Sequence, residues 1–268
     1  MVKRRFRLST AISLGGIVAA APLVAACGGG PSYDDWAATD GAAGIINLDD
    51  VQAAFKSSKS ATEFEQRVNE IYEGDGLILI RSKQDGNTLT LEGWEDLNGN
   101  NDIDDAQDDK LFSIVKGTND EYNMRGHGGN SYYGSQFGAG NFLMSYMLIS
   151  AISPRGYYYN TSVSRGASMR GQRNSYRQSS AYSRQVRRNS SFGSKQASFA
   201  GSRFQRSRSN VSSNRRTYQS RQRTSGAFRS SKSITRGRTG ASRSIGRSRG
   251  GGFRGGGGAM TVLRRDRF

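Results

Sequence analysis

Apolar residues in the first third of the chain recur with the period of an α-helix in two places. The first stripe follows the acidic pair Asp49-Asp50, which suits a helix N-terminus, and consists of Val51, Ala54 and Phe55. The second follows the capping-box sequence Ser60-Ala61-Thr62-Glu63 and consists of Phe64, Val68, Ile71 and Tyr72. The pattern predicts two short helices, the second ending at Gly74-Asp75-Gly76.

From Leu77 onward the pattern becomes strand-like. Four apolar or β-branched runs follow, and Asp85-Gly86, a strong hairpin signal, joins the first two; the runs are 77–80, 88–91, 111–115 and 121–124. The simplest arrangement is a four-stranded antiparallel meander with both helices on one face. The sequence therefore predicts a small α+β head over residues 45–126, in which about 80 residues bury only a modest core.

The rest of the chain has a different composition. Residues 127–154 are rich in glycine and aromatics and contain an apolar run at 142–152. As a helix that run would reach about 16 Å, too short to cross a bilayer core of about 30 Å. From 155 to 268, Arg, Ser and Gly dominate, aromatics occur singly, and aliphatic runs are almost absent. Such a segment buries too little apolar surface to offset its ordering entropy, so a long disordered tail is predicted.

Charge divides the chain at the same place. The protein carries a net charge of +17. Residues 155–268 hold 27 Lys and Arg and a single acid, Asp266, whereas residues 28–154 hold 21 acids and 8 basic residues. An acidic head of about −13 thus precedes a basic tail of about +26.

The N-terminus carries an export signal with three parts. Lys3-Arg4-Arg5 is followed by a weakly apolar stretch and then by Val24-Ala25-Ala26-Cys27. This end of the chain resembles bacterial lipoproteins, whose lipobox ends in cysteine. The resemblance implies cleavage after residue 26, lipidation of Cys27 and anchorage in the cell envelope. The glycine-rich run Gly28-Gly29-Gly30-Pro31-Ser32 separately predicts a flexible linker, placed at 27–44. In the lipoproteins that this end of the chain resembles, an aspartate after the cysteine retains the protein in the inner membrane. Because residue 28 is glycine, the resemblance favours the outer membrane.

An acidic loop lies between the second and third predicted strands. Oxygen-bearing side chains occupy every second position, at Asp96, Asn98, Asn100, Asp102 and Asp104. The loop resembles the start of an EF-hand calcium loop, in which oxygens wrap a hard cation. It departs from that pattern at Asn101, where glycine is usual, and at Gln107, where a glutamate closes the shell. A weak calcium site and a solvated acidic turn both remain open.

The basic tail predicts a polyanion-binding segment. Arginine offers a planar donor fork and the interspersed aromatics offer stacking surfaces, while Arg249-Gly250-Gly251 and Arg254-Gly255-Gly256 resemble RGG boxes of nucleic-acid-binding tails. The residues singled out for polyanion contact are Arg177, Arg187, Arg188, Arg215, Arg216, Arg249 and Arg254. In an envelope the available polyanions are lipopolysaccharide, acidic polysaccharide and extracellular DNA, which charge neutralisation hardly distinguishes.

The leading hypothesis is therefore a membrane-anchored, non-enzymatic envelope lipoprotein. The single cysteine is used for the anchor and His127 is the single histidine, which argues against thiol or histidine chemistry. Head carboxylates such as Glu92, Glu95 and Asp96 would form an acid/base pair only under the less favoured hypothesis of an enzyme. A surface coat assembled from acidic heads and basic tails, an unspecific spacer and a cytoplasmic RNA-binding tail are three further hypotheses that the same composition allows.

Overall fold

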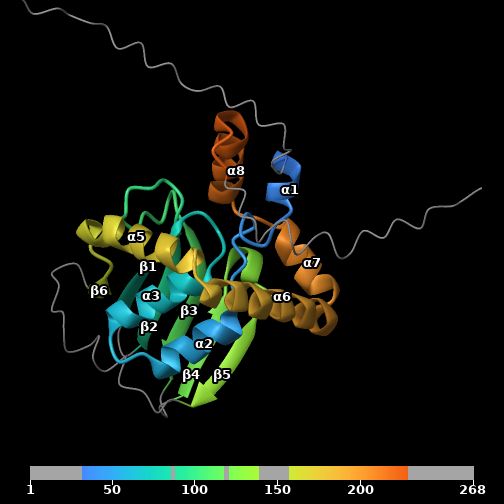
Figure 1. Cartoon of the computed structure of the whole chain (residues 1–268). Coiled ribbons are helices and arrows are strands. Elements are labelled where there is room, and N and C mark those ends of the chain that lie inside the picture. Colours follow the sequence, from blue (N-terminus) through green and yellow to red (C-terminus); the bar gives the residue numbers. More distant parts are fainter. Residues whose placement is uncertain (1–31, 86–87, 118–120, 139–156, 229–268) are drawn as a thin grey trace, which may run out of the picture.

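The computed structural model describes residues 32–85, 88–117, 121–138 and 157–228. Its centre is a six-stranded antiparallel sheet with the order β5-β4-β3-β2-β1-β6 (Figure 1). The strands are β1 (Leu77–Asp85), β2 (Thr88–Asp96), β3 (Asp109–Lys116), β4 (Glu121–Gly126), β5 (Gly134–Gly138) and β6 (Tyr157–Asn160). The predicted four-stranded meander is confirmed as β1 to β4, and one further strand extends each edge of the sheet.

Both predicted helices are present as α2 (Leu48–Ser57) and α3 (Ala61–Ile71). The Oγ of Ser60 accepts the amide of Glu63 at 3.1 Å, as a capping box requires. The Glu63 carboxylate, however, accepts the amide of Lys59 at 2.9 Å, one residue earlier than the motif predicts. Asn69 fastens α3 to the sheet, because its side chain exchanges hydrogen bonds with both the amide and the carbonyl of Ile78.

The head is larger than predicted at its N-terminal side. Residues 33–44, expected to be linker, contain α1 (Tyr33–Ala37), which is capped by Ser32. Trp36 is buried at 2 % exposure and packs with Ala42, Leu97 and Tyr218. The linker prediction is therefore wrong for this part, because one large aromatic residue is enough to fix a short helix to the domain.

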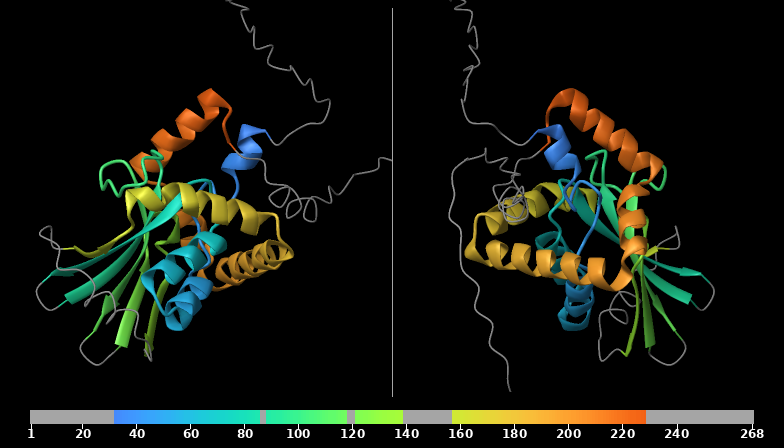
Figure 2. Two further views of the ribbon diagram at one scale, coloured as in Figure 1. Left: turned by 60° about the vertical axis from the view of Figure 1, so that its left-hand side comes forward. Right: turned by 90° about the vertical axis from the view of Figure 1, so that its right-hand side faces the viewer.

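The prediction of a disordered tail over 155–268 is wrong for residues 157–228. This segment adds β6, the single-turn η2 (Val163–Arg165) and four helices: α5 (Gly166–Arg177), α6 (Ser180–Ala200), α7 (Ser202–Ser209) and α8 (Ser213–Ser225). The helices wrap the head, and α8 returns to lie beside α1 (Figure 2). The apolar run 142–152 and residues 229–268 lie outside the described residues.

Several aromatic residues of the basic segment are core residues. Phe192 of α6 and Phe204 of α7 belong to the main apolar cluster, which otherwise comes from α2, α3 and one face of the sheet. The rings of Phe204 and Tyr132, which follows the single-turn η1 (Gly128–Asn130), meet edge to face with centroids 4.8 Å apart. Tyr218 of α8 completes the cluster around Trp36. The helices are therefore held by apolar burial that their overall composition conceals.

Arginines of α5 hold the connection between α3 and β1. Arg173 donates to the carbonyl oxygens of Asp75 and Gly76, and Arg177, one turn later, donates to those of Tyr72 and Gly74. A guanidinium has five donors in a fixed fork and so can cap several carbonyls of one turn. Arg173 and Arg177 lie one turn apart on the same face of α5. This face therefore binds the head through guanidinium hydrogen bonds to backbone carbonyls, where many helices use a stripe of apolar side chains.

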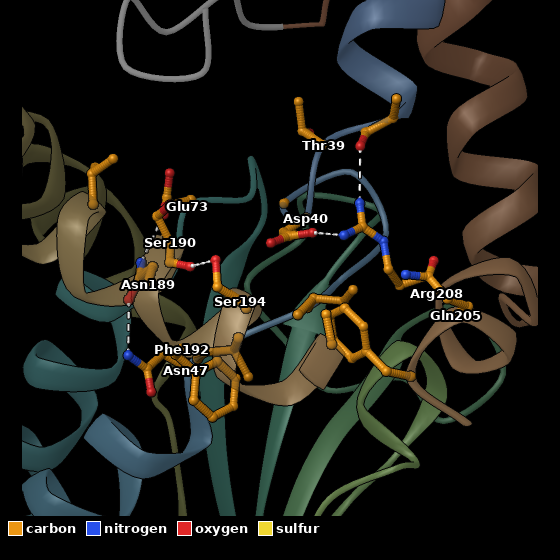
Figure 3. Close-up of a pocket in the computed structure, with 18 residues that line it drawn as sticks. Thr39, Asp40, Asn47, Glu73, Asn189, Ser190, Phe192, Ser194, Gln205 and Arg208 are labelled. Atoms are coloured by element: carbon orange, nitrogen blue, oxygen red, sulfur yellow. Dashed lines mark hydrogen bonds and ion pairs between the residues drawn. The ribbon is translucent and has the colours of Figure 1, made fainter. Parts of the chain in front are cut away.

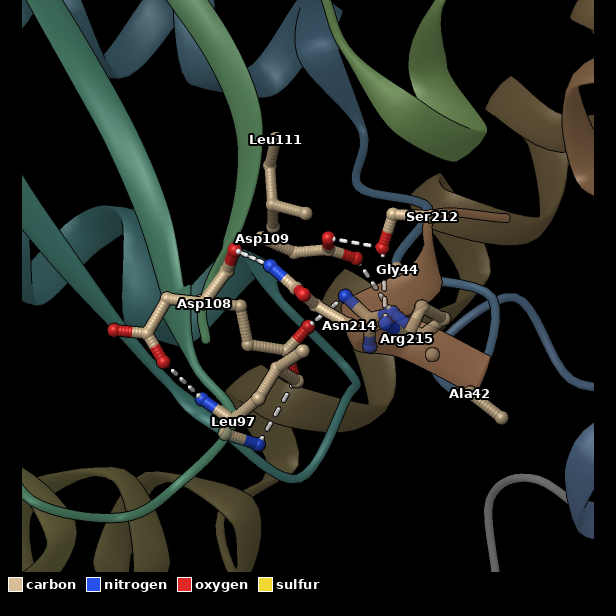
Figure 4. A network of polar contacts seen from close by, with 12 residues as sticks. Ala42, Gly44, Leu97, Asp108, Asp109, Leu111, Ser212, Asn214 and Arg215 are labelled. Atoms are coloured by element: carbon tan, nitrogen blue, oxygen red, sulfur yellow. Dashed lines mark hydrogen bonds and ion pairs between the residues drawn. The ribbon is translucent and has the colours of Figure 1, made fainter. Parts of the chain in front are cut away.

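Arg215 of α8 is the most deeply buried cation among the described residues, with a side chain 1 % exposed. Its Nε donates to Asp109 at 2.9 Å and its Nη2 donates to Glu95 (Figure 4). Ser212, the N-cap of α8, donates to the second oxygen of Asp109. The backbone of Gly44 comes so close that a Cβ there would lie 2.5 Å from Nη2, and its φ of +71° also favours glycine. The network ties α8, the sheet and the α1–α2 connection together.

Arg215→Ala is expected to lower the free energy of unfolding by about 3–5 kcal/mol, because it leaves two buried carboxylates without their counter-charge. The neighbouring Arg216→Ala provides a matched control, since Arg216 is exposed and its removal is expected to change stability by at most about 0.5 kcal/mol. Urea unfolding of both full-length variants measures the difference. Equal effects of the two substitutions would contradict a central role for the buried network.

Candidate functional site

One face of α6 carries a row of basic side chains. Ser179 caps the helix by accepting the amide of Tyr182, and the apolar side of the helix turns toward the core. On the other side, residues spaced by three and four line a shallow groove of about 540 Å³; they are Arg184, Arg187, Arg188, Ser191 and Lys195. Asn47, Asp49 and Asp50, at the start of α2, form the opposite wall. We call this surface the α6 groove.

Two of the four cations in the α6 groove are neutralised by the head. Arg188 Nε lies 3.0 Å from Asp50 Oδ2, and Lys195 Nζ lies 3.1 Å from Asp49 Oδ2. Arg184 and Arg187 are exposed and pair with no carboxylate among the described residues. The groove therefore keeps an excess of positive charge and can attract an anionic ligand.

The seven arginines predicted to contact a polyanion lie in different environments. Arg215 is buried in its ion-pair network, and Arg177 is used to cap backbone carbonyls. Arg187 and Arg188 lie together in the α6 groove, whereas Arg216 is exposed on α8 and donates to the carbonyl of Val211. Arg249 and Arg254 lie outside the described residues, as does Cys27. The prediction is wrong for Arg215, because a cation enclosed by Glu95 and Asp109 has no surface to offer.

Sequence reasoning missed Arg184, Lys195 and the two aspartates of the groove. A signal was present, because positions 184, 187, 188, 191 and 195 follow helical spacing. The low aliphatic content hid it, since a helix was not expected there. Phe199 at the end of the same helix is 88 % exposed, and it is the one large aromatic residue of α6 that is available for stacking.

The acidic loop is folded around its own backbone amides. The carboxylate of Asp96 accepts the amides of Gly99 and Asn101 at 2.6 and 3.0 Å, and the other four side chains predicted as calcium ligands each accept a nearby amide of the loop. Asn101 adopts the left-handed conformation, with a φ of 64°, at the position where an EF-hand loop has glycine. The loop's shape is thus held by its own side-chain to backbone hydrogen bonds.

Cations and donors from elsewhere occupy part of the loop's oxygen set. Arg170 of α5 places Nη2 3.5 Å from Asp96 Oδ2 and donates to the carbonyl of Gly99. Two aspartates that follow the predicted ligands are also engaged, because Asp105 binds Arg81 and Asp109 binds Arg215. Within the described parts of the chain, no group of three His, Cys, Asp or Glu side chains is arranged to hold a metal ion. Calcium binding stays a prediction.

Asp108 is a buried aspartate at the end of the loop, and no cation contacts it within the described structure. Its two oxygens accept the amides of Leu97 and Asp104, both at 2.9 Å. Burial, assisted by the nearby charge of Asp96, raises the pKa of Asp108 to about 6 against the opposing effect of these hydrogen bonds. The buried end of the loop therefore has uncompensated negative charge.

The three head carboxylates considered for acid/base chemistry are engaged in the structure. Burial opposes ionisation of Glu92, but hydrogen bonds from Lys110 and Arg81, each at 2.8 Å, outweigh it and lower its pKa to about 2. Glu95 accepts from Tyr72, from the amide of Gly76 and from Arg215. A carboxyl with a depressed pKa is a poor general acid near neutral pH. Glu92 and Glu95 act as counter-ions inside the fold.

Calcium gives a direct test of the acidic loop. A ligand that binds only the folded state at ten times its Kd stabilises it by about 1.4 kcal/mol, so millimolar calcium is expected to raise the melting temperature of the full chain by a few degrees. Asp102→Ala is expected to remove this rise, whereas Asp34→Ala, an exposed acid of α1, is expected to keep it. A melting curve that calcium leaves unchanged would leave only the solvated-turn interpretation.

Helices in the described part of the chain are too short or too polar to cross a membrane. Comparisons with protein-family models, with curated proteins and with solved structures find no match for this chain. The α6 groove is consequently interpreted from its own geometry and charge.

Proposed function

We propose that the protein is a non-enzymatic, lipid-anchored envelope protein that binds polyanions through the α6 groove and the basic residues that follow it. The observation that carries this proposal is the pair Arg184 and Arg187, two exposed arginines in one groove with no acidic partner among the described residues. Their planar donor forks suit phosphate and carboxylate groups.

The distribution of charge over residues 157–228 supports an anion-binding role for this surface. The segment has 15 basic residues and no acid. Six pair with head carboxylates: Arg165, Arg170, Arg188, Lys195, Arg208 and Arg215. Among the remaining cations, six arginines are exposed and have neither a head carboxylate nor a head carbonyl as a partner in the described structure: Arg184, Arg187, Arg203, Arg206, Arg216 and Arg223, the last of which lies over the ring of Tyr33. The inner cations hold the fold, and the outer ones supply the anion-binding charge.

Residues 229–268 add charge of the same sign. They contain 11 Lys and Arg, Arg249 and Arg254 among them, against the single acid Asp266. A polyanion longer than the α6 groove could contact both regions at once, and two linked contacts raise the overall affinity beyond either alone. The preferred ligands are lipopolysaccharide, acidic polysaccharide or extracellular DNA.

Self-assembly between heads and tails is less favoured by these contacts. The cations of residues 157–228 reach the carboxylates of their own head, for example Arg165 to Glu65 and Arg208 to Asp40. A neighbouring molecule would have to displace pairs that are already formed within one chain. Polyanion binding needs no such exchange, because it uses the outward-facing cations.

Replacing Arg184 and Arg187 together by glutamine is expected to weaken polyanion binding and to lower its salt dependence. Each lost phosphate contact should reduce the slope of log K against log salt by about one. Fluorescence anisotropy with a labelled 20-nucleotide single-stranded DNA, measured over a series of salt concentrations, gives the slope for the full-length chain. Urea unfolding should show unchanged stability, because neither side chain has a partner in the head.

The matched control removes two positive charges from the head, at Lys59 and Arg125, again by glutamine substitution; both residues are exposed. This variant is expected to keep nearly the original slope. If the two double variants lose the same affinity, binding follows net charge alone and the α6 groove is not a site. If neither weakens binding, the groove takes no part in it.

Cys27→Ser tests the anchor. If the lipobox is used, this substitution is expected to abolish lipid attachment, since the thiol is the acceptor, and to move the protein from the membrane fraction to the soluble fraction or leave it as precursor. Fractionation of bacterial cells with metabolic labelling by a fatty acid measures both effects. Normal processing and membrane retention of the serine variant would disprove the lipoprotein assignment.

A further inference from the structure

A second cavity, whose lining has the opposite charge to the α6 groove, lies on the inner side of α6. It has a volume of about 470 Å³. It is bounded by the α1–α2 connection, by Glu73, which follows α3, and by helices α6 and α7 (Figure 3). Its apolar wall consists of Ile45, Ile46, Val186, Phe192, Ala197 and Phe204. A cavity of this size can enclose a small organic molecule.

Two carboxylates line this cavity from different segments. Asp40 comes from the α1–α2 connection and Glu73 follows α3 (Figure 3). Glu73 Oε1 accepts a hydrogen bond of 2.8 Å from Asn189 of α6, and Glu73 Oε2 has no partner among the described residues. Asp40 Oδ2 likewise has no partner there and faces α6, where a Cβ on Gly193 would lie 3.4 Å from it. One oxygen of each carboxylate is thus left for a ligand.

The opposing charge is limited to one arginine in the lining. Arg208 Nη1 lies 2.7 Å from Asp40 Oδ1, but the approach lacks hydrogen-bond angles, so Oδ1 has no aligned donor. The other arm of Arg208 donates to the carbonyl of Ala38 at 3.1 Å. With two carboxylates against one guanidinium, the lining has a formal charge of −1 in a protein whose net charge is +17.

Asn189 fixes the position of Glu73. Its amide nitrogen donates to the carbonyl of Ile71 and to Glu73, and its oxygen accepts from Asn47 and from Gln185. All hydrogen-bonding positions of the amide are therefore used. A carboxylate held in this way is preorganised for a ligand.

Partial burial leaves both acids incompletely compensated. It is the main cause that raises the pKa of Asp40, which Arg208 only partly opposes. It also raises the pKa of Glu73, where the charge of Asp40 adds to the effect and Asn189 and Arg177 oppose it. A cation placed between the two carboxylates would offset the cost of burial, because it stabilises the ionised form of each.

We propose that this cavity binds a small organic ammonium compound, with its charged nitrogen at the free oxygens of Asp40 and Glu73 and its aliphatic part against the wall formed by α6 and α7. An ammonium group has three donors, which suits two carboxylate oxygens and one further acceptor. The site goes beyond the proposed function, because it selects the opposite charge.

Isothermal titration of the full-length protein tests the site with two matched probes. Pentane-1,5-diamine supplies the ammonium and a five-carbon body, and pentane-1,5-diol has the same length without charge. The diamine is expected to bind and the diol is not. A blocked lysine, Nα-acetyl-lysine methylamide, distinguishes the two sources of this chemistry: tighter binding than the diamine indicates a protein side chain, and weaker binding indicates a free amine.

Substitutions in the cavity lining are expected to change the affinity for the diamine in opposite directions. Asp40→Asn and Glu73→Gln are each expected to weaken diamine binding by about tenfold, the size of one charge-assisted hydrogen bond. Asp85→Asn, which removes the same charge from an exposed position at the end of β1, is expected to have no effect. Arg208→Gln should strengthen binding, because it removes the competing cation. A folding defect would weaken binding in every variant and cannot produce this gain.

Three results would overturn the proposal. The first is equal binding of diamine and diol, since the carboxylates would then contribute nothing. The second is an equal loss in Asp85→Asn and Asp40→Asn, which would show a general charge effect. The third is weaker diamine binding in an Arg208→Gln protein that melts at the original temperature.

Discussion

Charge compensation between Arg215 and the carboxylates of Glu95 and Asp109 is the interaction on which the helical half of the molecule depends. The guanidinium and the two carboxylates each depend on the other, because an uncompensated charge inside a protein costs several kcal/mol. The acidic head therefore needs the basic helices, and the helices need the head. The opposite charges of the two regions are thus used in part inside one fold, where six of the 15 cations of residues 157–228 pair with head carboxylates.

The sequence was informative where hydrophobic periodicity decides the structure. Residues 51–72 and the four runs from 77 to 124 became α2, α3 and β1 to β4, because each carries an apolar face that must be buried. The edge strands β5 and β6 could not be predicted in the same way. The described residues of β5 include only one buried apolar side chain, Phe137, and this strand is held by pairing with β4.

The four basic helices were missed for a physical reason. Their buried positions are filled by single aromatics and by polar residues, such as Phe192, Gln185 and Arg173, and no aliphatic stripe marks them. Composition alone predicts disorder for such a segment, but it ignores the carboxylates and carbonyls that the head presents. The α6 groove and the ammonium cavity were missed with the helices, because both take one wall from α6.

The long sequence separation of the stabilising contacts has a consequence for folding. Arg215 and Glu95 are 120 residues apart, and Arg165 and Glu65 are 100 apart. A chain with such distant pairings closes large loops before it gains their energy, which slows folding. Because the cations of α5 to α8 have no acidic partner within their own segment, those helices cannot form a stable unit ahead of the sheet. Charge thus couples the folding of the helices to the folding of the head.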